Sequence, residues 1–334
     1  MKTHTKKEIE RVRHTKISKM NFFIVDMIYR GMHAHSDLEL MLQLEGEVHI
    51  ETPEESFEAG YGDVVLFNPD LAHSLYAVER PCRALVLQID LSFCKAYFPD
   101  IRNIRFLASN MTKLLPEREY EELKRICYNI GYNYFGQYPA FEFRCMSDVN
   151  RLFSYLLTNV PYRVLSDEEY LLVLHAEKRM ERIVGYVNEH YMEKISLSDI
   201  AESENLSLSY LSHFFKDNLH QNFQSYVNSL RFEHAVYLLQ KTDMRILDIC
   251  LQSGFSDSKY LNNMFRDVYG ITPKEFRQKQ KEDPLPANKG HVKAGELNEY
   301  HLSMEEGMKL LRSRHHFHCD DGIHPHTILQ QDHE

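Results

Sequence analysis

The stretch GFSDSKYLNNMFRDVYGITPKEFR, residues 254–277, decides the fold of the C-terminal part of the chain. It starts with a glycine, which tolerates the positive φ that a tight turn can need. Apolar residues at helical spacing follow. The run then reaches Thr272-Pro273-Lys274-Glu275, where a capping Thr, a Pro at the first helical position and a Glu three residues after the cap predict a helix start. We therefore expect a turn and two helices here.

An earlier segment repeats this pattern at an offset of about 50 residues. Ser196 and Ser207 can cap its two helices, and Asn205 stands where the second copy has Gly254. Each copy predicts a short helix, a tight turn and a longer helix, which is the helix-turn-helix plan. An amphipathic helix over 223–241 would join them. The matched positions are Leu197, Asp199, Ile200, Asn205, Leu206, Ser207, Leu211, Phe215, Lys216 and His220 with Ile246, Asp248, Ile249, Gly254, Phe255, Ser256, Leu261, Phe265, Arg266 and Gly270.

The run from Ser196 to Arg277 resembles the DNA-binding domain of AraC/XylS-family transcription regulators. The sequence departs from the family pattern at Asn205 and His220, which replace frequent glycines, at Cys250, which replaces alanine, and at Leu261, which replaces an aromatic residue. The resemblance implies an all-α domain of two helix-turn-helix units joined by a long helix. It also implies a regulator of transcription that binds double-stranded promoter or operator DNA and is not an enzyme.

In this plan the second helix of each unit enters a major groove, so its exposed polar side chains are the candidate base readers. Asn can pair with adenine and Lys with guanine, while Arg266 and Lys274 suit phosphates. Tyr260, Leu261 and Phe265 are expected to anchor the second reading helix. The candidate DNA-binding residues are Ser209, Ser212, His213, Lys216, Ser258, Lys259, Asn262, Asn263 and Arg266.

The charge balance limits how DNA could be bound. The formal net charge is −10, and residues 176–280 hold 13 Lys and Arg against 14 Asp and Glu. Such a domain cannot coat nucleic acid by bulk attraction. Specificity would come from a few placed side chains, with a modest dependence on salt.

The segment from about 21 to 90 has a β texture, with short apolar runs separated by Gly, Pro and Asn. The expected strands are Phe22–Ile28, Leu38–Leu44, Val48–Glu51, Asp63–Phe67, Ser74–Val78 and Arg83–Ile89. Within them, Gly31-x-His33-x-His35-xxx-Glu39-xxxxxx-Gly46 and Gly62-Asp63-xxxxx-Pro69-xxx-His73 resemble the two cupin motifs, the second less closely. The resemblance implies a cupin β-barrel that senses an effector.

Four residues of these motifs are candidates for both effector and metal binding: His33, His35, Glu39 and His73. Alternate residues of one strand point the same way, so His33 and His35 should both face the barrel interior. Three imidazoles and a carboxylate suit a divalent transition metal. The same groups could instead line a pocket for a small polar effector such as a sugar, and the sequence leaves both alternatives open.

We therefore expect an α+β multidomain protein. Its parts are an effector-sensing barrel over 1–95, linker and dimerisation helices over 96–172, the DNA-binding domain over 173–280 and a polar, His-rich tail over 281–334. The clearest linker helices are Glu119–Ile130 and Met146–Leu157. The tail has eight histidines and one short helical piece near Met304–Arg312, and a flexible tail is favoured there over a metal site.

The remaining expectations concern location and partners. A charged N-terminus without an apolar core, and six scattered cysteines without Cys-x-x-Cys, predict a cytoplasmic chain with no membrane association. The family resemblance implies a homodimer, and contact with RNA polymerase if the protein is an activator. The alternative function is a cupin metalloenzyme, an isomerase or oxygenase, with a DNA-binding appendage.

Overall fold

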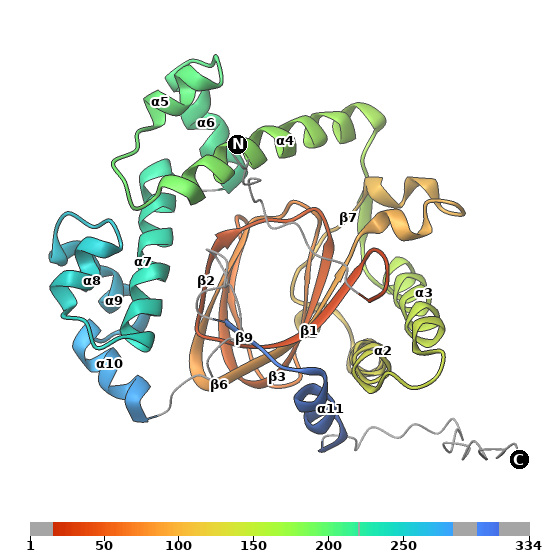
Figure 1. Cartoon of the computed structure of the whole chain (residues 1–334). Coiled ribbons are helices and arrows are strands. Elements are labelled where there is room, and N and C mark those ends of the chain that lie inside the picture. Colours follow the sequence, from red (N-terminus) through yellow and green to blue (C-terminus); the bar gives the residue numbers. More distant parts are fainter. Residues whose placement is uncertain (1–15, 220, 283–298, 314–334) are drawn as a thin grey trace, which may run out of the picture.

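A computed structural model describes residues 16–219, 221–282 and 299–313. The N-terminal part forms a curled antiparallel sheet in the order β4-β3-β6-β1-β9, with β2 paired to β6 and β5 paired to β3 (Figure 1). Its strands are β1 (Met20–Met27), β2 (Tyr29–His33), β3 (Leu38–Glu51), β4 (Ser56–Ala59), β5 (Val64–Phe67), β6 (His73–Ile89) and β9 (Glu299–His301).

Both faces of the sheet are buried. Successive residues of a strand point to opposite faces, and in these strands the residues that point to each face are largely apolar. In β1, Phe22 and Ile24 belong to the core beneath the linker helices, while Val25 and Met27 belong to the core inside the curl. The sequence predicted six separate strands. Two pairs of them merge, because β3 and β6 continue through bulges opposite one another instead of ending in turns.

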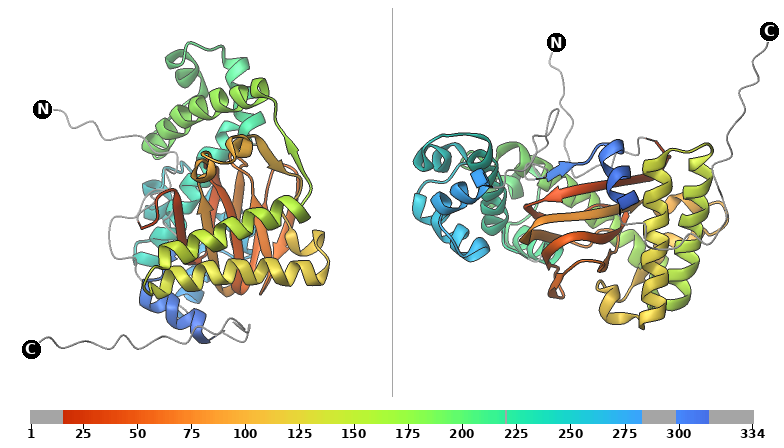
Figure 2. Two further views of the ribbon diagram at one scale, coloured as in Figure 1. Left: turned by 90° about the vertical axis from the view of Figure 1, so that its right-hand side faces the viewer. Right: turned by 90° about the horizontal axis from the view of Figure 1, so that it is seen from below.

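Helices α2 (Glu117–Gly136) and α3 (Phe141–Asn159) lie across the outer face of the sheet (Figure 2). Helix α2 begins directly after Pro116 and contains the predicted linker helix Glu119–Ile130. Between the sheet and α2 the chain forms η1 (Leu91–Cys94), η2 (Pro99–Asn103), β7 (Ile104–Phe106) and α1 (Met111–Leu114). After α3 it forms β8 (Tyr162–Val164), which pairs with β7 in a two-stranded ribbon.

The C-terminal part is helical. Its first helix, α4 (Asp167–His190), has a capping box formed by Ser166 and Glu169, a signal that the sequence reading missed. The predicted domain boundary after residue 172 falls inside this helix. The following helices are α5 (Leu197–Ser203), α6 (Leu208–Leu219), α7 (Phe223–Lys241), α8 (Ile246–Gln252), α9 (Ser258–Tyr269) and α10 (Pro273–Glu282).

The turn chemistry expected from the repeat is confirmed. Asn205 has φ 55° between α5 and α6, and Gly254 has φ 87° between α8 and α9. At the start of α10 the amide of Thr272 donates to Glu275, and the amide of Glu275 donates to the Thr272 hydroxyl. The two helix pairs, α5 with α6 and α8 with α9, thus have equivalent turns on either side of α7.

The sheet packs against both helix pairs. Ala72 joins the apolar cluster of α4, α5, α6 and the first half of α7. Ile28 and Tyr29 join the cluster of α8, α9, α10 and the second half of α7. The sheet therefore lies between α2 and α3 on one side and the C-terminal helices on the other (Figure 2).

The prediction of a polar tail beyond residue 280 is wrong for residues 299–313. Strand β9 adds to the edge of β1, and α11 (Met304–Ser313) packs on α2. Helix α11 matches the short helical piece expected near Met304–Arg312, but Gly307, Met308 and Leu311 are buried, so this part belongs to the fold. The other tail histidines, His291, His315, His316, His318, His324, His326 and His333, and Cys319 lie outside the described residues.

Two further expectations can be compared with the described residues. Within them, no helix is both long and apolar enough to cross a membrane. The five described cysteines, Cys82, Cys94, Cys127, Cys145 and Cys250, are buried and form no disulfide with one another.

Candidate effector site and DNA-reading helices

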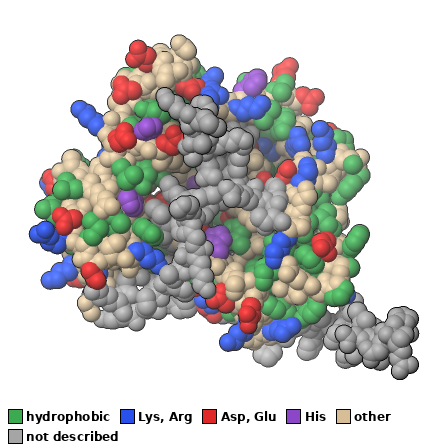
Figure 3. Space-filling model, in the orientation of Figure 1, with side chains coloured by type: hydrophobic (Ala, Val, Ile, Leu, Met, Phe, Trp, Pro, Cys, Tyr) green, Lys and Arg blue, Asp and Glu red, His purple; other side chains and the backbone are tan. Residues whose placement is uncertain are grey.

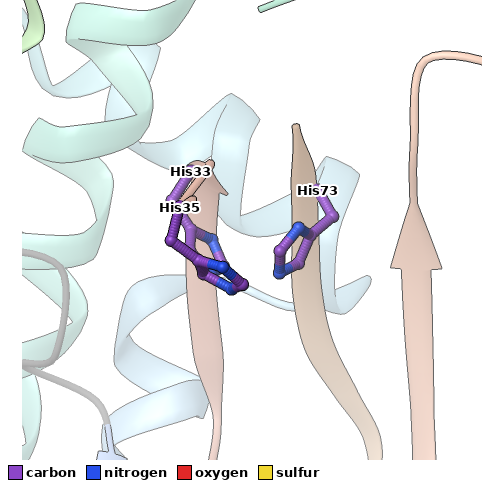
Figure 4. Close-up of side chains that lie close together, drawn as sticks. All are labelled: His33, His35 and His73. Carbon is purple, nitrogen blue, oxygen red and sulfur yellow. The ribbon is translucent and has the colours of Figure 1, made fainter. Parts of the chain in front are cut away.

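Three histidines meet inside the curled sheet (Figure 4). His33 lies at the end of β2 and His73 at the start of β6, opposite one another in the strand register. Their ring centroids are 4.2 Å apart. The alternation argument placed His35 on the same strand as His33. In the structure His35 lies just beyond the end of β2, but its ring still joins the cluster. One nitrogen of each ring lies within 4.8 Å of the others.

Backbone carbonyls hold all three rings in place. The Nδ1 atoms of His33, His35 and His73 lie 2.9, 3.0 and 2.9 Å from the carbonyl oxygens of Gly31, Asp37 and Leu71. A carbonyl only accepts, so each Nδ1 carries the proton and donates. In neutral rings this leaves Nε2 as a lone-pair donor, and the Nε2 of His73 is buried without a hydrogen-bond partner. The cluster thus presents imidazole nitrogens in the tautomer that binds metals or accepts hydrogen bonds.

Glu39 closes one side of the cluster from β3. Its Oε2 lies 2.9 Å from His35 Nε2, and its Oε1 lies 3.9 Å from His73 Nε2. Both nitrogens of His35 therefore face acceptors, which suits a protonated ring or one bound to a cation. Gln88 donates to the same carboxylate at 2.9 Å. The sequence reading missed Gln88, although a polar residue between Leu87 and Ile89 in an apolar strand was a usable signal.

The charges of the cluster follow from burial. Burial lowers the pKa of His33 and of His73 well below the ordinary value, and neighbouring positive groups lower both further. Burial would raise the pKa of Glu39, but the hydrogen bond and charge of His35 outweigh it and the pKa is lowered. The site therefore combines the neutral imidazoles of His33 and His73 with the carboxylate of Glu39, which is paired with His35.

A cavity of about 410 Å³ opens beside the cluster and reaches the helical domain. Of the four candidate residues, only His35 lines it. Two arginines, Arg105 and Arg163, provide positive charge, while α4 and the end of α6 form the wall facing the sheet. The lining includes Ala34, His35, Asn68, Asp70, Leu71, Ala72, Arg105, Phe106, Arg163, Val173, Ala176, Met180, Asp217 and Leu219.

Asp70 is the most perturbed carboxyl of this cavity. Burial raises its pKa to about 6, against the opposing influence of Arg105, whose Nη2 lies 3.8 Å away. It also has φ 65°, a conformation that few residues besides Gly, Asn and Asp adopt readily. Neither Asp70 nor Arg105 carries a motif signal, so the sequence did not indicate them.

Strand β2 connects the histidines to the central helix α7. The ring of Tyr29 packs edge-on against Phe232 at 5.3 Å. A Cβ on Gly31 would lie 3.6 Å from Glu233 Oε2, so the strand backbone comes close to the helix. His33 therefore lies only a few residues along β2 from the contact between this strand and α7.

The second helix of each pair presents the predicted side chains. Ser209, Ser212, His213 and Lys216 are exposed on α6, while Leu211 and Phe215 are buried beneath them. On α9, Lys259, Asn263 and Arg266 are exposed, and Ser258 and Asn262 are half-buried.

Two details of α9 differ from expectation. Tyr260 was expected to anchor the helix but is 58% exposed, because the anchoring positions are taken by Leu261 and Phe265. The Asn262 side-chain amide donates to the carbonyl of Ser258 at 2.9 Å within its own helix. This contact leaves Asn262 less able than Asn263 to reach a base.

Basic and acidic side chains are interspersed on the face drawn in Figure 3, without one dominant basic patch. This agrees with the near-neutral balance counted for residues 176–280. Binding of a polyanion here would depend on individual side chains and not on a broad positive surface.

Two families match the chain. Residues 25–128 match the family described as the AraC-like ligand binding domain. Residues 200–279 match the family described as a helix-turn-helix domain. The first match covers the histidine cluster and ends within α2, and the second runs from within α5 through α9.

The similar curated proteins are named as regulators of transcription. An uncharacterised HTH-type transcriptional regulator of Staphylococcus aureus is 25% identical over 236 residues, which are 70% of this chain and 30% of that protein. The uncharacterised HTH-type transcriptional regulator YdeC of Bacillus subtilis is 23% identical over 257 residues, 75% of this chain and 87% of that protein. The chain thus spans about 30% of the length of the first curated relatives that it matches.

Solved structures give partial matches. The C-terminal domain of the two-component response regulator yesN from Fusobacterium nucleatum is 37% identical, with a TM-score of 0.28 over 30% of this chain and 98% of that one. ToxT from Vibrio cholerae is 17% identical, with a TM-score of 0.42 over 78% of this chain and 97% of that one.

Proposed function

We propose that this chain is a transcriptional regulator of the AraC type, with a ligand-binding domain followed by a helix-turn-helix domain, and that it binds operator DNA through α6 and α9 under the control of a small effector. The observation that carries this proposal is the repeated helix pair with exposed polar side chains on its second helix. Two such pairs on one long helix can reach successive major grooves, about 34 Å apart on one face of the duplex.

Base reading is assigned chiefly to α9. Asn263 suits adenine, Lys259 suits guanine, and Arg266 suits a phosphate. The serines of α6 form weaker and more permissive contacts, so the first unit contributes more to positioning. Because the domain carries no surplus of basic residues, we expect a modest loss of affinity as salt rises.

The effector is proposed to be a small polar molecule, such as a sugar, that enters the cupin-type sensor domain. Supporting this are the polar groups of the histidine cluster and the adjoining cavity, whose wall includes Asp217 and Leu219 of α6. A ligand there would contact the sensor and a reading helix at once. It can act as a switch only if it binds one arrangement of the two better than the other.

The proposed route from the effector to DNA runs along β2. His33 lies in the cluster, while Tyr29 and Gly31 of the same strand contact α7. Because α7 connects both helix pairs, a small shift of β2 would alter the relative placement of the two reading helices. The spacing of two reading helices must match the groove spacing, so small shifts can change affinity.

A specific observation also favours a divalent transition metal in the cluster. Three Nδ1 atoms donate to backbone carbonyls, an arrangement that fixes the ring orientation of metal-binding histidines. His33, His35 and His73 would hold the ion, with Glu39 beside them. Such an ion would act as a Lewis acid that could bind an effector oxygen.

We expect the chelator-treated protein to take up about one equivalent of Zn²⁺. The substitution His73→Ala should lower the affinity for Zn²⁺ by more than about 100-fold, because loss of a metal ligand costs more than loss of a residue that only orients a ligand, which lowers metal affinity by about 10–100-fold. His49→Ala is the matched control, since His49 lies on β3 and hydrogen bonds to Ser56 instead of joining the cluster. Calorimetry with Zn²⁺ measures both variants. Equal uptake by wild type and His73→Ala would refute the metal site without affecting the DNA proposal.

The alternative of a cupin metalloenzyme is not supported by the comparisons, because the matched families and relatives are regulators and not enzymes. We further propose that the protein acts in the cytoplasm as a homodimer. The outer face of α2 and α3 is the proposed contact, because these two long helices lie at the molecular surface (Figure 2). Contact with RNA polymerase is proposed for the case that it activates transcription.

The DNA proposal is tested by offering the full chain a pool of random-sequence duplexes and sequencing those retained. We expect enrichment of two short conserved blocks whose centres are about one helical turn apart. Recovery of unenriched sequence at every salt concentration would refute sequence-specific binding.

A further inference from the structure

The chain returns to the sensor domain after its DNA-binding helices. Residues 299–313, here called the strap, form β9 and α11, and lie beyond the helix-turn-helix match, which ends at residue 279. Strand β9 covers the edge of β1, where Met27 pairs with Glu299 and Val25 with His301. The amide of Leu302 donates to the carbonyl of Ile24 at 2.9 Å. Figure 1 shows the strap (blue) passing from β9 to α11.

The strap is closely fitted to its surface. A Cβ on Gly307 would lie 2.3 Å from a ring carbon of Phe135, so only glycine allows α11 to approach α2 this closely. Met308 and Leu311 are buried in the core shared with α2 and α3. The hydroxyl of Tyr128 donates to the carbonyl of Leu311. Ser303 and Glu306 cap the start of α11, so the helix has its own start signal.

A buried ion pair ties the strap to β2. Arg30 Nη1 lies 3.1 Å from Glu299 Oε2, and the two side chains are only 7% and 8% exposed. Arg30 stands between Tyr29 and Gly31, the residues of β2 that contact α7. Removing one partner of a buried ion pair strongly destabilises the folded structure, because the other partner is left as an uncompensated buried charge. Release of the strap would therefore disturb the part of β2 on which α7 rests.

In the structure, acidic side chains of the sensor lie on the cavity that α6 also lines. The exposed sensor residues Glu54 and Glu55 line the same cavity as Asp217 of α6. Carboxylates beside a reading helix repel phosphates and lower affinity. The DNA-binding helices are also covalently connected to the sensor at both ends, by α4 before them and by the segment that leads to the strap after them.

We propose that the strap is an intramolecular clamp that holds the DNA-binding helices against the sensor in a low-affinity arrangement, and that its release from β1 and α2 raises affinity for DNA. This proposal rests on the proposed DNA-binding function. The occupant of the β1 edge and the α2 surface is the chain's own segment, and its detachment would free the helix pairs to move away from the acidic sensor residues.

The test compares full-length Gly307→Leu, whose side chain cannot fit against Phe135, with Lys309→Ala, a matched control at an exposed position of α11. Hydrogen exchange at the Leu302 amide reports strap release, and fluorescence anisotropy with a duplex selected by the wild type reports affinity. We expect Gly307→Leu to lose protection at Leu302 and to bind DNA about 10-fold more tightly, a coupling of ordinary size. Lys309→Ala should match the wild type in both.

Loss of protection at Leu302 with unchanged or weaker DNA binding would overturn the clamp. If Gly307→Leu does not fold, a chain ending at residue 298 takes its place, with exchange at β6 amides confirming an intact sheet; tighter binding supports the clamp and equal or weaker binding refutes it. Failure of every protein, wild type included, to select any duplex would instead refute the DNA-binding proposal.

Discussion

Replacing both Lys259 and Asn263 by alanine is expected to weaken binding to the selected duplex by about 100-fold. Each side chain is exposed on α9 and suited to a base edge, and a good base contact contributes about 1–3 kcal/mol of discrimination. Asn262→Ala should cost less than Asn263→Ala, because the Asn262 amide already donates to Ser258. Fluorescence anisotropy at fixed salt measures all of these variants.

Lys309→Ala is the control for this series, since it removes one exposed lysine far along the chain from the reading helices. It should leave affinity within about twofold of the wild type, because exposed surface substitutions seldom matter much. Wild-type affinity in the double variant would contradict the placement of α9 in a groove. A uniform loss across all sequences would mean that these residues contact only the backbone.

Gly254→Ala is expected to destabilise the C-terminal helices by about 3 kcal/mol. The glycine has φ 87°, which an L side chain adopts only with strain. A Cβ would also lie 2.8 Å from Met192 Cα and 2.9 Å from the Met192 carbonyl oxygen, and a backbone cannot rotate away as a side chain can. Strain and overpacking of this kind each cost about 1–3 kcal/mol.

Thermal unfolding followed by circular dichroism should show the loss as a fall in Tm of about 10 °C. The matched control is Asn205→Gly at the equivalent turn between α5 and α6, where φ is 55° and the residue is exposed. Glycine accepts that conformation, so this variant should stay within about 1 kcal/mol of the wild type. An unchanged Tm in Gly254→Ala would mean that the turn is not the constraint proposed here.

The helical half of the chain was largely predictable because its signals are local. The repeat, the Ser196 and Ser207 caps and the Thr272-Pro273-Lys274-Glu275 start each depend on neighbours in sequence. The predicted helix over 223–241 coincides with α7. The wrong assignment of Tyr260 to the core shows the limit of this approach, since the apolar character of a residue does not say which side of a helix meets a partner.

The candidate site was predictable in its residues but not in its setting. The motif spacing brought together His33, His35 and His73, since strand pairing places β2 beside β6. Gln88 and Arg105 lie in parts of the chain that carry no motif, and Asp70 occupies an unspecified position within the second motif. Likewise, nothing local shows that Glu299 pairs with Arg30, because that contact joins residues from opposite ends of the chain.

The central claim is that α6 and α9 read two successive major grooves of one duplex. Hydroxyl-radical footprinting of the full chain on its selected duplex tests this most directly. The account predicts two protected stretches on the same face of the DNA, with centres about 10 base pairs apart, and loss of the α9 stretch in the Lys259→Ala, Asn263→Ala variant. A single protected stretch, or an unaltered footprint in that variant, would contradict it.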